Sequence, residues 1–393
     1  MSRAALAPRA DFPVLDEVVY LNTGSIGLES LPVQRAAEKL GRQIAGRGTV
    51  GFDDEVEKEI FDVPRAAAAR LLGAEPDDIA LVTHATEALC QVAWWLKPAA
   101  GENVVSADLE FPSVTYPWLR LAGDTGVELR LAPALGDPAS FSLDTIAAAV
   151  DEKTAVICVS HVQYATGHRL DPAALVELAR SVGATLVLDA TQSAGVVPLD
   201  APGLDVDVLV TSGYKWLCSA PGVGVCYLRR ELSERLDPPF VGWRSVEDQT
   251  AYDATKIALA PGARRLEYST PAYAAGAALS AAVDYLLELG IMNVLAHDLS
   301  LAAELRAGLD SLGADVLTPA EDDRRAGIVV SRFPGRSDKE LAARLAEAGV
   351  IVSPRLGAVR FSLHVFNDSS DVERTLDALG TILGDPAGRV TRS

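Results

Sequence analysis

Thr211-Ser212-Gly213-Tyr214-Lys215-Trp216-Leu217 separates two apolar segments, residues 206–210 and 222–228. Segments of this length and composition are typical of buried β-strands. Lys215 therefore follows the end of a strand, and strand ends in α/β sheets open onto the crevice that binds ligands. The chain has 7 Lys against 28 Arg, so a surface position would more often carry arginine. The position of Lys215 predicts that its amine points into a ligand site.

The amine of Lys215 suits a covalently bound cofactor. A desolvated lysine has a lowered pKa and can form a Schiff base with a carbonyl group. The cofactor with this chemistry is pyridoxal 5'-phosphate (PLP). The hypothesis makes four further demands on the chain: an acid for the pyridine nitrogen, donors for the phosphate, an aromatic ring against the cofactor and a cation for the substrate carboxylate.

Apolar segments and helical patterns alternate on the N-terminal side of Lys215. This order is typical of an α/β fold, a mainly parallel seven-stranded sheet with helices on both faces. The expected strands are residues 79–82, 103–106, 127–131, 154–159, 184–188, 206–210 and 222–228, and the expected helices are residues 30–45, 53–72, 85–95, 114–121, 143–150 and 172–182. The last strand follows its predecessor too closely for a helical crossover, so we expect it to be antiparallel.

The pattern changes after residue 231. Residues 232–265 are irregular, and two helices are expected at residues 271–289 and 293–312. Alternating strands and helices then follow at residues 327–333, 339–347, 359–363 and 371–383, which is the pattern of a smaller C-terminal α+β domain. We therefore expect an N-terminal segment at residues 1–28 that packs on the small domain, with a short strand at residues 17–22, a large PLP-binding domain at residues 29–265 and a small domain at residues 266–393.

Composition restricts the class of protein. The 393 residues carry a net charge of -19, which argues against nucleic acid and anionic membranes as partners. Residues 1–12 do not form a secretory signal, and no apolar run reaches the ~18 residues of a membrane span. The four cysteines lack C-x-x-C spacing, so we expect reduced thiols, no zinc site and a cytoplasmic location.

Asp189 ends the apolar segment Leu186-Val187-Leu188, 26 residues before Lys215 and one strand away from it. Neighbouring strand ends can present both side chains to one crevice, where a protonated pyridine nitrogen would supply the cation that a buried carboxylate needs. The alternative is that Asp189 caps a following helix. Gln192, three residues later, is a candidate donor to the phenolic oxygen of the cofactor.

The phosphate donors are expected where residues 83–88 join a strand to a helix. The N–H groups at Ala85 and Thr86 begin the helix and form an anion site, to which Thr86 adds a hydroxyl. The alternative is an ordinary threonine cap. Ser212 and Tyr214, beside Lys215, are further candidate donors.

Three other side chains meet the remaining demands. Phe111 follows a strand end and can lie against the cofactor ring, although a core position is the alternative. His161 follows the next strand end and is either a cofactor contact or a structural histidine. Arg360 interrupts a short apolar strand, and its planar guanidinium suits a substrate carboxylate, the alternative being a solvent-facing arginine on an edge strand.

Together these stretches resemble the class V aminotransferases, a family of fold-type I PLP enzymes. The resemblance covers nearly the whole chain, through THATEA, SADLEFPS, HVQYATGHRLD, LVLDATQS, TSGYKWL, RRLEYSTPAY and VRFSLHVFN in family order. It implies a homodimer with a shared active site, PLP on Lys215, and Asp189 at the pyridine nitrogen. It also implies that Thr270 reaches the phosphate of the neighbouring subunit and that the turn around Asn22 closes the substrate site.

Two departures narrow the resemblance. Cysteine desulfurases carry His where Phe111 and Tyr214 stand, and they need a mobile cysteine in the C-terminal part, whereas no Cys follows Cys226. The chain looks more like the kynureninase, isopenicillin N epimerase and cysteine-conjugate lyase side of the family. It is therefore expected to act at Cα and Cβ of an amino acid, as a β-elimination lyase on a cysteine-type conjugate.

The alternatives come from the same family and from outside it. Within it, the chain is an aminotransferase or an amino-acid epimerase. A non-catalytic PLP-binding regulator is disfavoured because such proteins carry a basic DNA-binding domain ahead of this fold. A Rossmann nucleotide-binding domain is disfavoured because no G-x-G-x-x-G follows the first strand.

Overall fold

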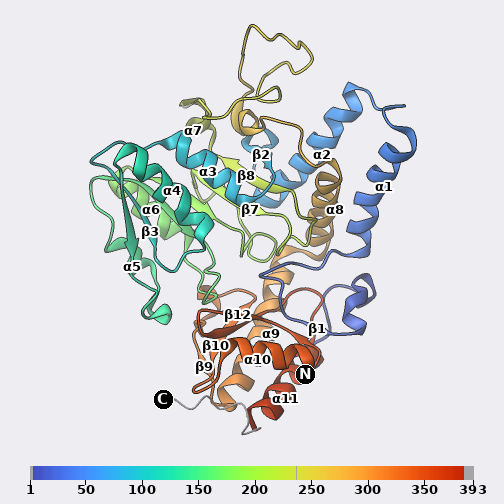
Figure 1. The fold of residues 1–393 in the computed structure, drawn as a ribbon, viewed down its shortest axis with the longest axis vertical. Helices are drawn as coiled ribbons and strands as arrows, with labels where there is room; N and C mark the ends of the chain where they lie inside the picture. Colours follow the sequence, from blue (N-terminus) through green and yellow to red (C-terminus); the bar gives the residue numbers. More distant parts are fainter. Residues whose placement is uncertain (1–2, 236, 385–393) are drawn as a thin grey trace.

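A computed structural model describes residues 3–235 and 237–384, and its centre is a seven-stranded sheet (Figure 1). The strand order is β2-β8-β7-β6-β5-β3-β4. Six strands run parallel, and β8 is antiparallel to both of its neighbours. The strands are β2 (Ile79–Val82), β3 (Asn103–Ala107), β4 (Glu128–Ala132), β5 (Thr154–Ser160), β6 (Thr185–Asp189), β7 (Val208–Ser212) and β8 (Gly224–Leu228). The predicted α/β sheet and its antiparallel strand are confirmed.

Helices cover both faces of this sheet because successive strand residues point to opposite sides. On one face, strand residues such as Leu186 and Leu188 pack with α2, α5, α6 and α8. On the other face, the intervening residues, Val187 among them, pack with α3 and α4. The helices outside the small sheet are α1 (Leu31–Arg47), α2 (Asp54–Leu72), α3 (Ala85–Leu96), α4 (Pro112–Thr125), α5 (Leu143–Ala147), α6 (Pro172–Val182), α7 (Arg230–Arg235) and α8 (Tyr273–Leu289).

A smaller antiparallel sheet of order β12-β13-β10-β9 lies below the central sheet in Figure 1. Its core is formed with three helices, and a separate parallel pair joins β1 near the N-terminus to β11. These elements are β1 (Val19–Tyr20), α9 (Ile291–Ser311), β9 (Asp315–Val316), β10 (Ile328–Arg332), α10 (Asp338–Glu347), β11 (Val350–Ile351), β12 (Ser353–Arg355), β13 (Ala358–Ser362) and α11 (Ser369–Gly384). The smaller C-terminal domain is confirmed, while the predicted domain boundaries stay a prediction.

The structure departs from the sequence-based expectations mainly at edges and irregular segments. Strand β4 pairs only with β3 and is largely exposed, so it is not the fully buried strand its neighbours suggested. The irregular residues 232–265 include most of α7 and the beginning of a 3-10 helix at Gly262–Leu266. Strands β9, β11 and β12 were not predicted because two or three residues carry no periodic pattern. No single helix within the described residues has the length and apolarity of a membrane span; α8 and α9 reach it only as a pair bent by 76°.

Candidate active site

Strand register brings Lys215 and Asp189 to the same edge of the sheet. Ser160, Asp189 and Val210 are paired across β5, β6 and β7, and Lys215 lies three residues after the end of β7. All three strands are parallel, so their carboxyl ends meet at one crevice. Because the two side chains are close, the charge of Asp189 raises the pKa of Lys215.

Two aromatic rings flank the amine of Lys215. Its Nζ lies 5.4 Å from the ring centre of Phe111 and 5.9 Å from that of Tyr214. Phe111 is 44% exposed, so the alternative of a core position is wrong. The Phe111 ring meets Tyr164 edge to face, with centres 5.4 Å apart. The amine therefore lies in an aromatic corner that a planar cofactor ring can share.

The protonation of Lys215 gives a pH prediction. Burial lowers its pKa to about 8, with Asp189 opposing and Arg360 and Arg355 adding to the effect. Schiff-base formation needs the neutral amine, whose fraction rises with pH up to this pKa and is constant above it. The rate at which apoprotein binds PLP is expected to rise about tenfold per pH unit below pH 7 and to level off above about pH 8.5. Stopped-flow absorbance measures this rate, and a rise continuing through pH 10 would contradict the lowered pKa.

Asp189 is a buried carboxylate without an ion pair among the described residues. It is 7% exposed, and its Oδ1 accepts from the Thr191 N–H at 2.8 Å. Burial raises its pKa, and the charge of Lys215, the basic group that acts on it, opposes this rise. No helix lies between Asp189 and the start of β7, so the helix-capping alternative is wrong. A protonated pyridine nitrogen would satisfy the remaining oxygen, and PLP fits the site on this ground.

A set of hydroxyls surrounds the N-terminus of α3. The Ala85 N–H donates to Ser212 Oγ at 3.0 Å, and Thr86 Oγ1 lies 2.7 Å from Ser113 Oγ. The cap of α3 is His84, whose Nδ1 accepts from the Glu87 N–H, so the threonine-cap alternative is wrong. A helix N-terminus with hydroxyls beside it favours an anion. The predicted phosphate donors Ala85, Thr86 and Ser212 therefore lie together, and Tyr214 joins them through the hydrogen bond between its side chain and Ser212.

Arg360 is buried without an acidic partner in the described part of the chain. It is 1% exposed; its guanidinium donates to Ser25 Oγ at 2.7 Å and to the Tyr164 carbonyl at 3.2 Å, and its Nε has no partner. Burial and, to a smaller extent, the charge of the nearby Arg355 lower its pKa to about 9. Because β13 lies between β12 and β10, the solvent-facing alternative is wrong. A substrate carboxylate is the partner that this guanidinium lacks.

Gln192 links the strand ends to the N-terminal turn. Its Nε2 donates to the Gly24 carbonyl at 3.0 Å, and its Oε1 accepts from Trp216 Nε1 at 2.7 Å. A Cβ on Gly24 would lie 2.8 Å from Ser362 Oγ and 3.1 Å from the guanidinium carbon of Arg360. The turn therefore needs glycine in order to close over the site. One N–H of Gln192 is left for the phenolic oxygen, and this role stays a prediction.

Three predicted residues remain: His161, Asn22 and Thr270. His161 donates its backbone N–H to the Asp189 carbonyl, its ring contacts Ser193 Oγ at 2.9 Å, and burial lowers its pKa to about 3, so the ring is neutral. Asn22 bridges to Ser362, and its buried Oδ1 has no described partner. Thr270 is exposed in the segment before α8, as a residue that reaches another subunit must be.

Sequence reasoning missed Ser25, its partner Arg355, and Glu110. Ser25 accepts hydrogen bonds from both Arg360 and Arg355, whose NH2 lies 3.2 Å away. Glu110, directly before Phe111, is 6% exposed and accepts from the Ser160 N–H at 2.8 Å. Burial raises the pKa of Glu110 to about 7; the charge of Asp189 adds to this rise, and the hydrogen bonds from Ser160 oppose it. The position of Glu110 at a strand end was the available signal; Ser25 had none.

A buried ion pair holds the backbone beside Lys215. His364 Nδ1 lies 3.1 Å from Asp298 Oδ2, and His364 Nε2 lies 3.0 Å from the Trp216 carbonyl, with His364 and Asp298 both 0% exposed. Burial alone would lower the pKa of His364, but Cys218 and Asp298 outweigh it and raise that pKa. His364 therefore fixes the backbone at Trp216, next to Lys215, and does not line the site.

Asp298→Ala is expected to destabilise the protein by about 3–5 kcal/mol, because it leaves the buried imidazolium of His364 without its carboxylate. The midpoint of chemical unfolding measures the loss. Asp310→Ala, at an exposed position of the same helix, is the control and should unfold like wild type. Equal midpoints for the two variants would mean that His364 is neutral.

The comparisons with known proteins agree with this geometry. The family profile Aminotransferase class-V matches residues 44–375. An uncharacterized aminotransferase YcbU of Bacillus subtilis is 30% identical over 94% of this chain and 95% of its own length. Isopenicillin N epimerase of Streptomyces clavuligerus is also 30% identical, over 94% of this chain and 96% of its own.

Solved structures share the fold. An apo cysteine desulfurase from Thermococcus onnurineus has a TM-score of 0.85 and 25% identity, and the match covers 95% of this chain and 97% of that one. A cystine C–S lyase in complex with its product cysteine persulfide has a TM-score of 0.86 and 24% identity, and the match covers 94% of this chain and 99% of that one. At this identity the similarity shows the fold alone. The chain therefore belongs to the class-V aminotransferase family and is a PLP-dependent enzyme.

Proposed function

We propose that this enzyme breaks the C–S bond of a cysteine-type conjugate by β-elimination. The observation that carries the proposal is the distribution of thiols. Cys158 and Cys226 are fully buried in central strands, Cys218 is 6% exposed, Cys90 is partly exposed on α3, and no cysteine follows Cys226 in the sequence. A desulfurase needs a thiol that accepts the substrate sulfur, and this chain offers none from its C-terminal part. Sulfur released from Cβ would then leave with the rest of the conjugate.

The chain's own residues fit the steps of such a reaction. Bound PLP supplies an electron-accepting ring for the carbon next to the amino group. Arg360, Ser25 and the Gly24 turn hold and orient the substrate carboxylate. The released Lys215 amine then removes the proton at Cα as general base. Asp189 keeps the pyridine nitrogen protonated, while Phe111 and Tyr164 cover one side of the site.

Arg360→Gln tests the carboxylate anchor. Losing a buried, charge-assisted contact is expected to raise KM for the amino-acid substrate about 100-fold, with a smaller change in kcat. Steady-state kinetics measure both constants. Arg332→Gln, on the neighbouring strand β10, is the control and should leave KM unchanged. A purely structural role for Arg360 would lower the amount of folded enzyme and leave KM as it is.

The reaction class is tested with S-substituted cysteines in the absence of a keto acid. Elimination releases pyruvate and ammonia, which coupled assays detect. Absence of pyruvate, together with amino transfer to an added keto acid, would identify an aminotransferase and overturn the proposal.

Epimerisation is the second candidate, since the relative from Streptomyces clavuligerus, 30% identical, is an isopenicillin N epimerase. It requires that the proton return to the opposite face of Cα. Chiral chromatography of the recovered substrate would show this as growth of the second stereoisomer without pyruvate.

We also propose a homodimer in which Thr270 binds the phosphate in the neighbouring site. The exposed position of Thr270 before α8 supports this role. Light scattering of the holoenzyme gives its mass, and Thr270→Val should weaken PLP binding without changing the absorption maximum. The cytoplasmic location stays a prediction.

A further inference from the structure

Arg244 is a buried guanidinium without a hydrogen bond. It belongs to the irregular segment between α7 and α8, between Lys215 and Thr270 in the sequence. The residue is 4% exposed, and within residues 3–235 and 237–384 its side chain donates to no acceptor, with Nε fully buried. Burial lowers the pKa of Arg244. A buried charge in this state is costly, so its presence requires a physical explanation.

The acid next to Arg244 is already engaged. Glu267 accepts two hydrogen bonds from Arg65, at 2.8 and 2.7 Å, and a third from the Leu81 N–H at 2.9 Å. The shortest N–O distance between Arg244 and Glu267 is 3.9 Å, beyond hydrogen-bond range. Arg65 also pairs with Asp62 through its other terminal nitrogen, so Arg65 engages both nearby carboxylates and Arg244 is left without a hydrogen-bonded acid.

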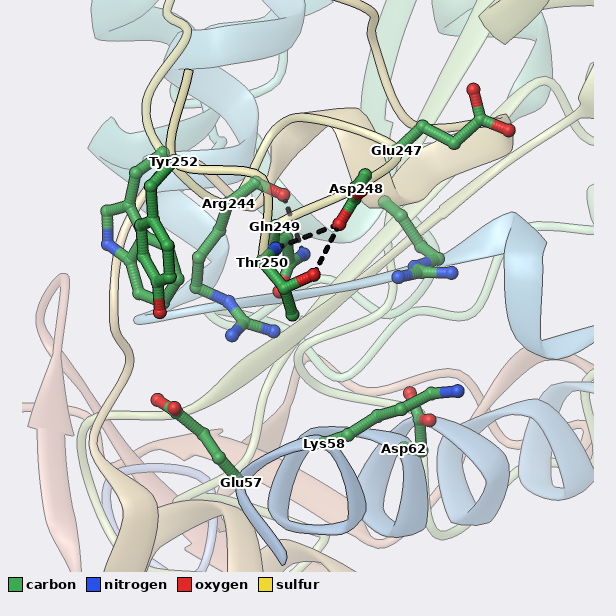
Figure 2. A pocket seen from close by; sticks show the side chains of 11 residues that line it. Glu57, Lys58, Asp62, Arg244, Glu247, Asp248, Gln249, Thr250 and Tyr252 are labelled. Carbon is green, nitrogen blue, oxygen red and sulfur yellow. Dashed lines mark hydrogen bonds between the residues drawn. The ribbon is translucent and has the colours of Figure 1, made fainter. Parts of the chain in front are cut away.

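Aromatic packing fixes the orientation of the guanidinium. Its central carbon lies 3.4 Å from the ring centre of Phe61, which is 1% exposed, and 5.3 Å from that of Trp243. One end of the side chain faces a cavity of about 250 Å³ between α2 and the segment that carries Arg244. Figure 2 shows Arg244 directed into the space between Thr250 on one side and Glu57 and Lys58 on the other. We call this space the Arg244 cavity.

None of the other charged side chains that line the Arg244 cavity accepts a hydrogen bond from Arg244, although the charge of Glu57 opposes the lowering of its pKa. Glu57 accepts from the Tyr273 hydroxyl at 2.6 Å, and Asp248 accepts from the N–H and hydroxyl of Thr250 at 3.0 and 2.7 Å. Lys58 and Arg264 add two cations to the lining. Glu57 and Asp248 are thus hydrogen-bonded within the chain, Asp62 is paired with Arg65, and Glu247 is the fourth acid of the lining. The guanidinium of Arg244 has no hydrogen-bonded acceptor among the described residues.

We propose that the Arg244 cavity binds the carboxylate or phosphate group of a small molecule, with Arg244 as its anchor. A guanidinium held flat against an aromatic ring presents its fork of N–H donors, which matches the paired oxygens of these anions. The volume lies below the roughly 300–1,000 Å³ of pockets for drug-sized ligands, so the ligand is a small anion or the anionic end of a larger molecule.

The test compares unfolding midpoints of PLP-loaded protein in sodium chloride, sodium phosphate and sodium acetate at equal ionic strength. Wild type is expected to gain about 2 °C or more in phosphate or acetate, whichever anion the cavity takes. Arg244→Met, which keeps the packing on Phe61, should lose this gain and unfold in chloride no earlier than wild type, because an unpaired buried charge has been removed. Arg42→Met, at an exposed position of α1, should respond like wild type.

Acetate can also bind to Arg360. Each salt is therefore repeated with Arg360→Gln protein, in which a change of the unfolding midpoint can come only from Arg244. Arg244→Lys keeps the positive charge but lacks the forked N–H donors, so the anion should raise its unfolding midpoint by less than in wild type. This variant replaces Arg244→Met in the test if the methionine variant does not fold. An equal salt response in wild type and Arg244→Met overturns the proposal. A change of oligomeric mass in Arg244→Met, with the salt response intact, would instead assign the guanidinium to an acid of a second copy of the chain.

Discussion

Lys215→Ala is expected to abolish turnover, with a loss of at least about 1,000-fold in kcat. The substitution removes the amine that binds the cofactor covalently and that serves as general base at Cα, and a general base alone contributes about 10²–10⁴-fold. The purified variant should bind PLP without a covalent bond. Borohydride reduction followed by intact-protein mass spectrometry should then show cofactor attached to wild type and none attached to the variant.

Lys153→Ala is the matched control for this experiment, because Lys153 is exposed in a turn before β5. It should keep the covalent cofactor and full activity. If Lys215→Ala retained cofactor after reduction and unfolding, another lysine would carry the cofactor, and the assignment of the active site would be wrong.

Asp189→Asn is expected to lower kcat at least about 100-fold while leaving the covalent bond at Lys215 intact. A neutral amide cannot hold the proton on the pyridine nitrogen, so the ring becomes a weaker electron acceptor. The buried amide also removes the charge that raises the pKa of Lys215. The pH at which uptake of PLP levels off should therefore fall below about pH 8, which stopped-flow absorbance can measure in the same variant.

Glu177→Gln, at an exposed position of α6, controls for the loss of one negative charge elsewhere. It should change neither kcat nor the pH dependence. If Asp189→Asn lowered kcat without moving the pH dependence, Asp189 would act on the cofactor alone and not on the amine.

Much of the central sheet could be predicted because its strands are short, apolar and separated by helices. Strand β2 was predicted at its observed bounds, and the antiparallel direction of β8 followed from the short distance to β7 along the sequence. The meeting of Asp189 and Lys215 was also predictable, since they follow neighbouring strands. These inferences need only local pattern and sheet topology.

The contacts that could not be predicted join residues far apart in the chain. Ser25 meets Arg360 across 335 residues, and His364 meets the Trp216 carbonyl across 148. Arg244 belongs to a segment without periodicity, so its burial against Phe61 had no local signal. Such contacts depend on how the small sheet and the N-terminal turn pack against the central sheet.

The hydrogen bonds on either side of Lys215 have a consequence for biosynthesis. The Tyr214 carbonyl accepts from the Gly27 N–H at 2.8 Å, and the Trp216 carbonyl is held by His364, so opposite ends of the polypeptide clamp the reactive residue. A nascent chain that has emerged from the ribosome only as far as β8 lacks half of this clamp. We therefore expect stable capture of the cofactor only after the chain has been made through His364.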